Sequence, residues 1–402
     1  MSAAPDKNPY RPGASTPPLF LAGREPQLLR FPKTLRAAPE IPANLRLTGL
    51  RGVGKSVLLK EFERLAKDGG WAVLRQQMEP RHNTDQALSE FVSNAVDAAT
   101  SRMSRTKRLR RQMSGVVETG RPPLTVSYED ITIGLAGSPS SELDVGRNLY
   151  AAVEAARDTG HEGFALLLDE AQVIRDDRGR GGEHPMSMLV AAVNALQEAG
   201  LPLALVLCGL PTLRANLQRA RTYSERMFRG EQIAELSGNP GPARDAFVRP
   251  LADSGIAADE DLIARVLLEV EGYPFFIQLW GAELWEAARD ARTGRFSTAL
   301  LDAIEDDIYE RLDEEFYAGP VETLTPAEQD LLLDTAECPY PPLRTADLQS
   351  RSVKSENNIN VLMGRLADQG VIYRVQKGVY EYTAPKFHPY LIRRRAAQTS
   401  GD

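Results

Sequence analysis

From Gly49 to Ser56 the chain reads Gly49-Leu50-Arg51-Gly52-Val53-Gly54-Lys55-Ser56, which fits the pattern G-x-x-x-x-G-K-[ST]. Glycines in such a loop let backbone N–H groups curl around phosphate oxygens, because glycine adopts backbone angles that other residues reach only at a cost. The lysine of the pattern reaches the β- and γ-phosphates, and the serine hydroxyl binds Mg²⁺. The stretch therefore predicts a site for a nucleoside triphosphate and a magnesium ion.

The residues on either side of the loop strengthen this prediction. Residues 45–48 read as a short strand, and residues 56–67 have helical spacing, with an apolar stripe that begins at Val57. A strand, a glycine loop and a helix in this order place phosphate at a helix N-terminus. The residues expected to bind ATP are Gly49, Leu50, Arg51, Gly52, Val53, Gly54, Lys55, Ser56 and Val57. The alternative interpretation is a glycine-rich turn that binds nothing.

Two carboxylates follow a second strand. Residues 164–168 form a continuous apolar run that is typical of a buried parallel strand, and Asp169 and Glu170 come directly after it. This places both acids at the carboxyl edge of the sheet, where ligands of α/β proteins bind. We expect Asp169 and Ser56 to hold Mg²⁺, and Glu170 to polarise the water that attacks the γ-phosphate. The alternative is a solvated strand end.

Hydrophobic periodicity divides the chain into three parts. Apolar strands alternate with helices as far as about residue 236, which predicts an α/β fold with a parallel sheet. Helices alone are expected over 243–251, 259–269, 274–289 and 297–316. From about residue 324, short helices precede two strands joined by a turn at 376–378, which is a winged-helix pattern with its third helix at 355–368.

Six segments resemble motifs of the AAA+ ATPases. Within that superfamily the chain is similar to the origin-recognition and cell-division-cycle initiator proteins, and to related bacterial and archaeal ATP-binding proteins near the STAND class. The segments are Leu21–Glu25, the Walker A loop Gly49–Ser56, the Walker B strand Leu166–Gln172, the sensor-1 strand Leu205–Pro211, Tyr223–Phe228, and Gly272–Phe276 at the start of the sensor-2 helix. The resemblance covers roughly residues 19–290.

The resemblance implies a domain organisation. We expect an AAA+ P-loop ATPase domain over 19–236, a small helical lid over 237–318 and a winged-helix domain over 319–395. A disordered leader over 1–18 and a tail over 396–402 are expected at the two ends, and an insertion over about 101–140 within the ATPase domain.

The resemblance also assigns further site residues. Gly23 and Arg24 would flank the adenine, and Arg226 or Arg229 would act as an arginine finger on the nucleotide of a neighbouring subunit in an ATP-dependent homo-oligomer. An ordinary surface arginine is the alternative for Arg226. The sensor-1 strand ends in Cys208-Gly209 and the sensor-2 helix begins without an arginine, so the sequence departs from the family where nucleotide is sensed.

Bulk composition excludes several classes of protein. Hydrophobic residues make up 42% and charged residues 26%, which is ordinary for a soluble globular protein. The apolar runs are too short to span a bilayer, so no membrane partner is expected. Two distant cysteines define no disulfide framework, and the N-terminus has no signal-peptide pattern, which together predict a cytoplasmic protein.

Charge is unevenly distributed along the chain. The net charge is −7, yet basic residues cluster at 102–111. From residue 340 to the end, the chain has ten basic and five acidic residues. The cluster favours either phosphate contact or a solvated insertion, and the winged helix favours either double-stranded DNA or an unknown protein partner.

Three hypotheses for the whole chain remain open. The first is a magnesium-dependent ATPase that couples nucleotide state to assembly on DNA or a partner. The second is a slow ATP-gated signalling or defence switch. The third is an adaptor that binds nucleotide without hydrolysis.

Overall fold

The structure of the chain is a computed structural model, which describes residues 7–13, 15–114, 140–177, 182–237, 241–252 and 254–399. The chain divides into two compact units. The sheet unit comprises 24–49 and 55–233, and the helical unit comprises 1–23, 50–54 and 234–402.

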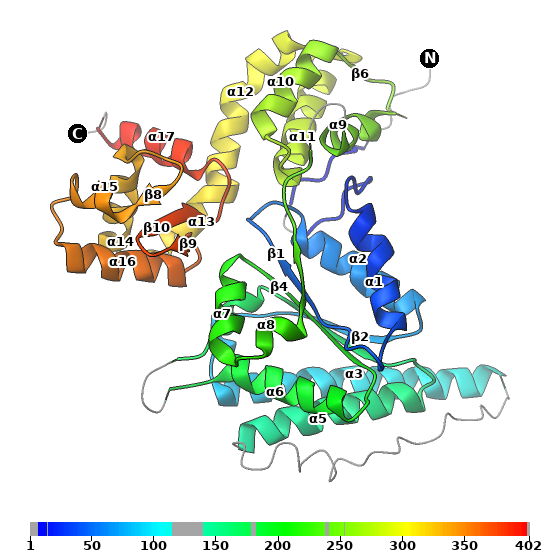
Figure 1. The fold of residues 1–402 in the computed structure, drawn as a ribbon. Coiled ribbons are helices and arrows are strands. Elements are labelled where there is room, and N and C mark those ends of the chain that lie inside the picture. Colours follow the sequence, from blue (N-terminus) through cyan, green and yellow to red (C-terminus); the bar gives the residue numbers. More distant parts are fainter. Residues whose placement is uncertain are drawn as a thin grey trace. The chain divides into compact units, whose positions relative to one another are not determined.

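Five parallel strands form the centre of the sheet unit, in the order β2-β3-β4-β1-β5 (Figure 1). The strands are β1 (Leu45–Thr48), β2 (Ala72–Gln77), β3 (Phe164–Asp169), β4 (Leu203–Gly209) and β5 (Arg229–Gln232). Every residue of β3 and β4 is buried, because helices cover both faces of the sheet. The predicted α/β fold with a parallel sheet is confirmed, although the polar edge strand β5 carries no apolar signal and was not predicted as a strand.

Helices form a layer on each face of this sheet. On one face α2 packs against β2, β3 and β4, with α1 beside it, and the other face is covered by α3, α5 and α6. These helices are α1 (Glu25–Arg36), α2 (Lys55–Asp68), α3 (Asp85–Ser114), α5 (Ser140–Asp158) and α6 (Pro185–Glu198). Two shorter helices, α7 (Thr212–Ala220) and α8 (Ser224–Met227), lie between β4 and β5 in the chain.

The helix α3 corrects the prediction for the basic cluster. An insertion was expected from about residue 101, yet α3 continues to Ser114 and takes the backbone of 102–111 into a regular helix. Arginine and lysine are good helix formers, so this run extends a helix that the apolar pattern alone would have ended near residue 100. The rest of the predicted insertion, from 115 to 139, lies outside the described residues.

Where a lid was predicted, the helical unit consists mainly of helices, and their role as a lid stays a prediction. Its helices pack around a core that includes Trp280 and Trp285, both fully buried. They are α9 (Pro242–Val248), α10 (Glu260–Val270), α11 (Pro274–Asp290) and α12 (Thr298–Leu312), and the short strands β6 (Ala257–Ala258) and β7 (Arg295–Phe296) pair beside them.

The leader over 1–18 is not disordered where the structure describes it. Tyr10 is buried, its hydroxyl donates to the carbonyl of Phe247, and its ring lies against Gly281 of α11. The amide N–H of Arg11 donates to Gln278 Oε1 at 2.9 Å. An aromatic residue in a stretch rich in proline supplied the apolar area and the hydroxyl that hold this segment on the lid.

The last part of the helical unit is a winged helix. Three helices precede a hairpin, and β8 pairs with β10 to give a three-stranded sheet in the order β8-β10-β9. The elements are α14 (Pro326–Asp334), β8 (Leu343–Arg344), α15 (Thr345–Gln349), α16 (Glu356–Asp368), β9 (Ile372–Gln376) and β10 (Val379–Tyr382). A one-turn helix α13 (Gly319–Glu322) comes before them and α17 (Phe387–Thr399) follows. No helix among the described residues is both long and apolar enough to cross a membrane.

Candidate functional site

Three strands bring the predicted site residues of the sheet unit to one edge. Thr48 at the end of β1 pairs with Gly209 at the end of β4, and Asp169 ends the neighbouring strand β3. The N–H of Gly49 donates to the carbonyl of Gly209 at 3.3 Å. Lys55 then begins α2, and its side chain is buried, with only 7% of its surface exposed. A lysine and a carboxylate thus share the edge where α/β proteins bind phosphate ligands.

Glycines shape the loop between β1 and α2. Gly52 and Gly54 have φ angles of +78° and +86°, a backbone region that favours glycine. Within the helical unit, Gly52 lies against the side chains of Phe275 and Phe316, where an added Cβ would come within 3.3 Å of both. The carbonyl of Gly52 accepts the N–H of Phe275 at 3.2 Å, and the N–H of Arg51 donates to the carbonyl of Thr383 at 2.8 Å. Within the helical unit, Gly52 therefore contacts helix α11 and Arg51 contacts the chain after the hairpin of the winged helix.

Glu170 is held by its neighbours in an uncommon backbone conformation. Its φ is +52°, and its own N–H donates to Asp169 Oδ1 at 3.0 Å. Its carboxylate oxygen Oε2 accepts the side-chain amide of Gln172 at 2.6 Å. A residue at positive φ is uncommon for a non-glycine and points to a position fixed by its surroundings.

Gln172 also explains why the sensor-1 position has no polar side chain. Its Oε1 accepts the N–H of Leu210 at 3.1 Å, and it lies so close to Gly209 that a Cβ there would come within 2.3 Å of this oxygen. The amide of Gln172 thus occupies the space next to the end of β4 and connects it to Glu170. Gln172 lies within the Walker B segment, but its role could not be predicted from the sequence, because no spacing rule assigns a role to the third residue after the aspartate.

Cys208 lies beside the carboxylate of Asp169, and its thiol is expected to react slowly. Complete burial, helped by the charge of Asp169, raises the pKa of its thiol well above the usual value. The thiolate is the nucleophile, so a raised pKa lowers reactivity. In the folded protein at pH 8 we expect iodoacetamide to label Cys208 more slowly than in guanidinium-unfolded protein, on the order of a hundredfold. Equal labelling rates in the two states, measured by peptide mass spectrometry, would contradict the buried position.

The two residues predicted to flank the adenine lie where the units join in the chain. Gly23 has a φ of +67°, and a Cβ there would come within 2.8 Å of Pro242 at the start of the lid. Arg24 is buried at the N-terminal end of α1. Their contact with adenine stays a prediction, as does the role of Arg226, which is exposed on α8.

The donor set suits magnesium. Among the described residues no group of three or more histidine, cysteine, aspartate or glutamate side chains could hold a metal ion. Mg²⁺ keeps several waters and takes one or two protein oxygens together with substrate phosphates. One carboxylate at Asp169 and one hydroxyl at Ser56 fit that chemistry, whereas zinc or calcium would need a fuller protein shell.

Known structures share the fold of this chain. A Walker-type ATPase of Pyrococcus abyssi matches with 18% identity over 95% of this chain and 98% of that chain, at a TM-score of 0.56. The chain has the fold of an AAA+ P-loop ATPase. The Aeropyrum pernix ORC2 protein, solved as ADPNP-ADP complexes, matches with 12% identity over 96% of this chain and 98% of that chain, at a TM-score of 0.51. The AAA+ likeness to initiator-type proteins and the winged-helix end are thereby confirmed at the level of the fold.

At the level of sequence, one family model matches, and it covers only the C-terminal part of the chain. The family model of a domain of unknown function, DUF8462, matches residues 314–391, which contain the winged helix. No curated protein matches the sequence.

Proposed function

We propose that the chain binds MgATP, hydrolyses it, and couples the nucleotide state to assembly on DNA or on a partner protein. The observation that carries this proposal is that Lys55, Asp169 and Glu170 lie at the same edge of the sheet. Phosphoryl transfer needs mainly positioning and charge neutralisation, so a lysine, a metal and one base suffice. The Aeropyrum pernix protein of the same fold was solved with ADPNP and ADP, which supports a nucleotide as the ligand.

Each site residue has a distinct role in the proposed reaction. Lys55 neutralises the β- and γ-phosphates, while the loop N–H groups from Gly52 to Ser56 orient them. Bound Mg²⁺ supplies charge neutralisation, held through Ser56 and Asp169. Glu170 accepts the proton of the attacking water, and Gln172 fixes the direction of its carboxylate through the hydrogen bond to Oε2.

The positioning role of Gln172 gives a prediction. Replacing Gln172 with alanine removes the donor to Glu170, and a hydrogen bond to a charged group contributes roughly 1.5–3 kcal/mol. We expect kcat for ATP to fall about tenfold, and the Kd for ATP to stay the same, because no phosphate contact is lost. Gln218→Ala is the matched control, since Gln218 also donates to a glutamate, Glu225, at 2.8 Å, outside the site. An unchanged kcat in Gln172→Ala would remove Gln172 from the mechanism.

The winged helix supplies the proposed contact with DNA. The exposed residues of α16 include Asn357, Asn360 and Arg365, with the apolar Val361 exposed among them. Arg374 and Lys377 of the β9–β10 hairpin are exposed as well. Asparagine and arginine side chains read base edges and phosphates, and basic wings contact the backbone.

The decisive experiment measures ATP turnover by the whole chain with and without duplex DNA, in magnesium and after its removal by EDTA. We expect turnover that requires Mg²⁺ and rises with duplex DNA, with DNA affinity that falls steeply as salt increases. Turnover that survives EDTA would contradict the proposed metal site.

The alternative proposal is a slow ATP-gated switch whose winged helix binds protein. The glycine at position 209, where the resemblance leads one to expect a polar sensor residue, favours it. Salt-insensitive or absent DNA binding, together with an ATP-dependent change in oligomer size by light scattering, would favour this alternative over the first proposal.

A further inference from the structure

A groove lies at the opposite end of the sheet from Asp169 and Gly49. It has a volume of about 610 Å³ and lies entirely within the sheet unit. Asn44, the residue before β1, and Arg229, the first residue of β5, form one part of its lining, and the second half of α1 forms another. Parallel strands start at this edge of the sheet and end at the edge that carries Asp169 and Gly49. The groove is therefore distinct from the proposed ATP site.

The groove is strongly basic. Four of its lining residues carry positive charge: Arg30, Lys33, Arg226 and Arg229. Among the described residues, Glu231 is the carboxylate that pairs with them, at 2.8 Å from Arg30 Nη1 and 3.6 Å from Arg229 Nε. Four positive charges and one negative charge leave a balance of +3 at the groove of a chain whose net charge is −7. Local potential of this sign concentrates anions.

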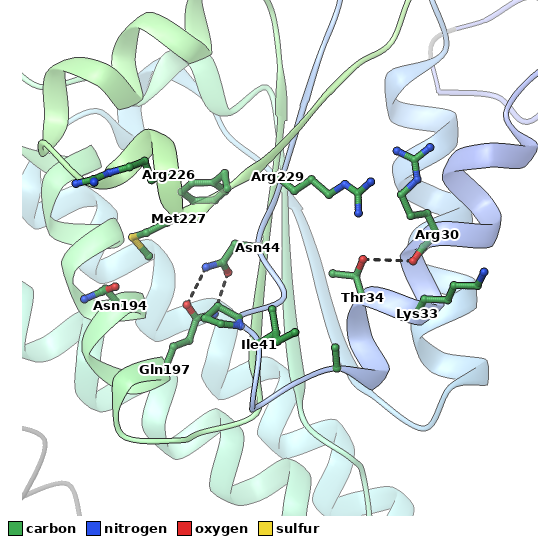
Figure 2. A pocket seen from close by; sticks show the side chains of 13 residues that line it. Arg30, Lys33, Thr34, Ile41, Asn44, Asn194, Gln197, Arg226, Met227 and Arg229 are labelled. Atoms are coloured by element: carbon green, nitrogen blue, oxygen red, sulfur yellow. Dashed lines mark hydrogen bonds between the residues drawn. The ribbon is translucent and has the colours of Figure 1, made fainter.

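The carboxylate of Glu231 fixes the positions of the Arg30 and Arg229 guanidinium groups. The side chain of Glu231 is only 10% exposed, and it holds Arg30 on α1 and Arg229 on β5 in place. Figure 2 shows Arg229 extending from the sheet toward the helix that carries Arg30. A guanidinium has five donors, so the contacts with Glu231 leave most of them available for an anion.

The floor of the groove is rigid and its wall is apolar. The side-chain amides of Asn44 and Gln197 bond to each other at 2.7 and 2.9 Å (Figure 2). Asn44 Oδ1 also accepts the N–H of Leu205. These bonds hold both amides in place, and the charged donors of the groove come from its basic residues. Ile41, Met227 and Phe228 supply apolar surface between them.

We propose that this groove binds a compound with two or more linked phosphates, a nucleotide or an inorganic oligophosphate. Arginine pairs suit phosphate oxygens, because their planar forks bind two oxygens at once. The volume lies in the range of small-molecule sites, and the apolar wall offers a surface for a base or another ring. The proposal is independent of ATP hydrolysis at Lys55.

The test separates this groove from the Walker site and from a neighbour's nucleotide. Binding of ADP and of inorganic tripolyphosphate is measured by calorimetry in Lys55→Ala, which lacks the Walker lysine in every subunit. We expect both probes to bind, and the added changes Lys33→Ala and Arg229→Ala to weaken them at least tenfold. The matched control in the same background is Arg36→Ala with Arg219→Ala, which removes two exposed charges of the same unit outside the groove.

Each outcome decides the proposal. Tighter binding of ADP than of tripolyphosphate would show that the apolar wall contacts the base, and equal affinity would show that the phosphates alone are recognised. The proposal fails if neither probe binds Lys55→Ala, if the control pair weakens binding as much as the groove pair, or if a poly-glutamate peptide binds the groove while neither phosphate compound does. In the wild type, the proposal requires ADP or tripolyphosphate to occupy two sites per chain at saturation, and a single site for each probe would overturn it.

Discussion

Lys55→Ala is expected to weaken MgATP binding at least a hundredfold, which is about 2.7 kcal/mol of binding free energy. The ammonium group begins α2 at the end of the glycine loop, and its side chain is 7% exposed, so its charge acts in a site with little water to screen it. Alanine leaves the loop N–H groups in place but removes the single positive charge predicted to reach the β- and γ-phosphates. Titration with a fluorescent ATP analogue measures the change, and both proteins also carry Lys33→Ala and Arg229→Ala so that the basic groove does not bind the analogue.

The control for this prediction is Lys60→Ala. Lys60 belongs to the same helix, α2, but is exposed on its surface, so its loss changes the net charge equally without touching the site. We expect Lys60→Ala to bind the analogue within about twofold of the wild type. Undiminished affinity in Lys55→Ala would refute the role of Lys55, and a parallel loss in both variants would indicate a general charge effect instead.

The sequence predicted the parts of the fold that one pattern determines. A glycine loop between a strand and a helix, and an apolar strand that ends in Asp169 and Glu170, have few alternative structures, so both stand where they were expected. Strand β5 was missed because an edge strand such as Arg229–Gln232 has no apolar face to reveal it. Tyr10 and the long α3 were mispredicted because composition near them favoured disorder, while tertiary burial and helix propensity favoured order.

The contacts around the site required the structure itself. Gln172 is one polar residue among many in the sequence, and only the fold brings the nitrogen and the oxygen of its side-chain amide to Glu170 and Leu210. The basic groove joins residues of α1, α8 and β5 that are almost two hundred positions apart in the chain, so no local pattern could have grouped Arg30 with Arg229.

Glu170→Gln is expected to keep ATP binding and to lower hydrolysis at least a hundredfold, since general bases contribute roughly 10²–10⁴-fold to rate. Glutamine has the shape of glutamate but cannot accept the proton of the attacking water. Lys55 and Asp169, which hold the phosphates and the metal in the proposed mechanism, are untouched, so the Kd for MgATP should stay within about threefold of the wild type. Single-turnover hydrolysis and equilibrium binding of the same preparation measure both quantities.

The backbone of Glu170 makes this variant a demanding test. A φ of +52° strains the backbone of any residue other than glycine, so glutamate and glutamine at position 170 have the same strain energy. The substitution therefore changes the chemistry of the side chain while the local fold stays under the same constraint. Glu90→Gln, an exposed carboxylate on α3 of the same unit, controls for the loss of one negative charge. Equal turnover in Glu170→Gln and the wild type would exclude Glu170 as the base, whereas a loss of ATP binding in step with turnover would place Glu170 in nucleotide binding instead.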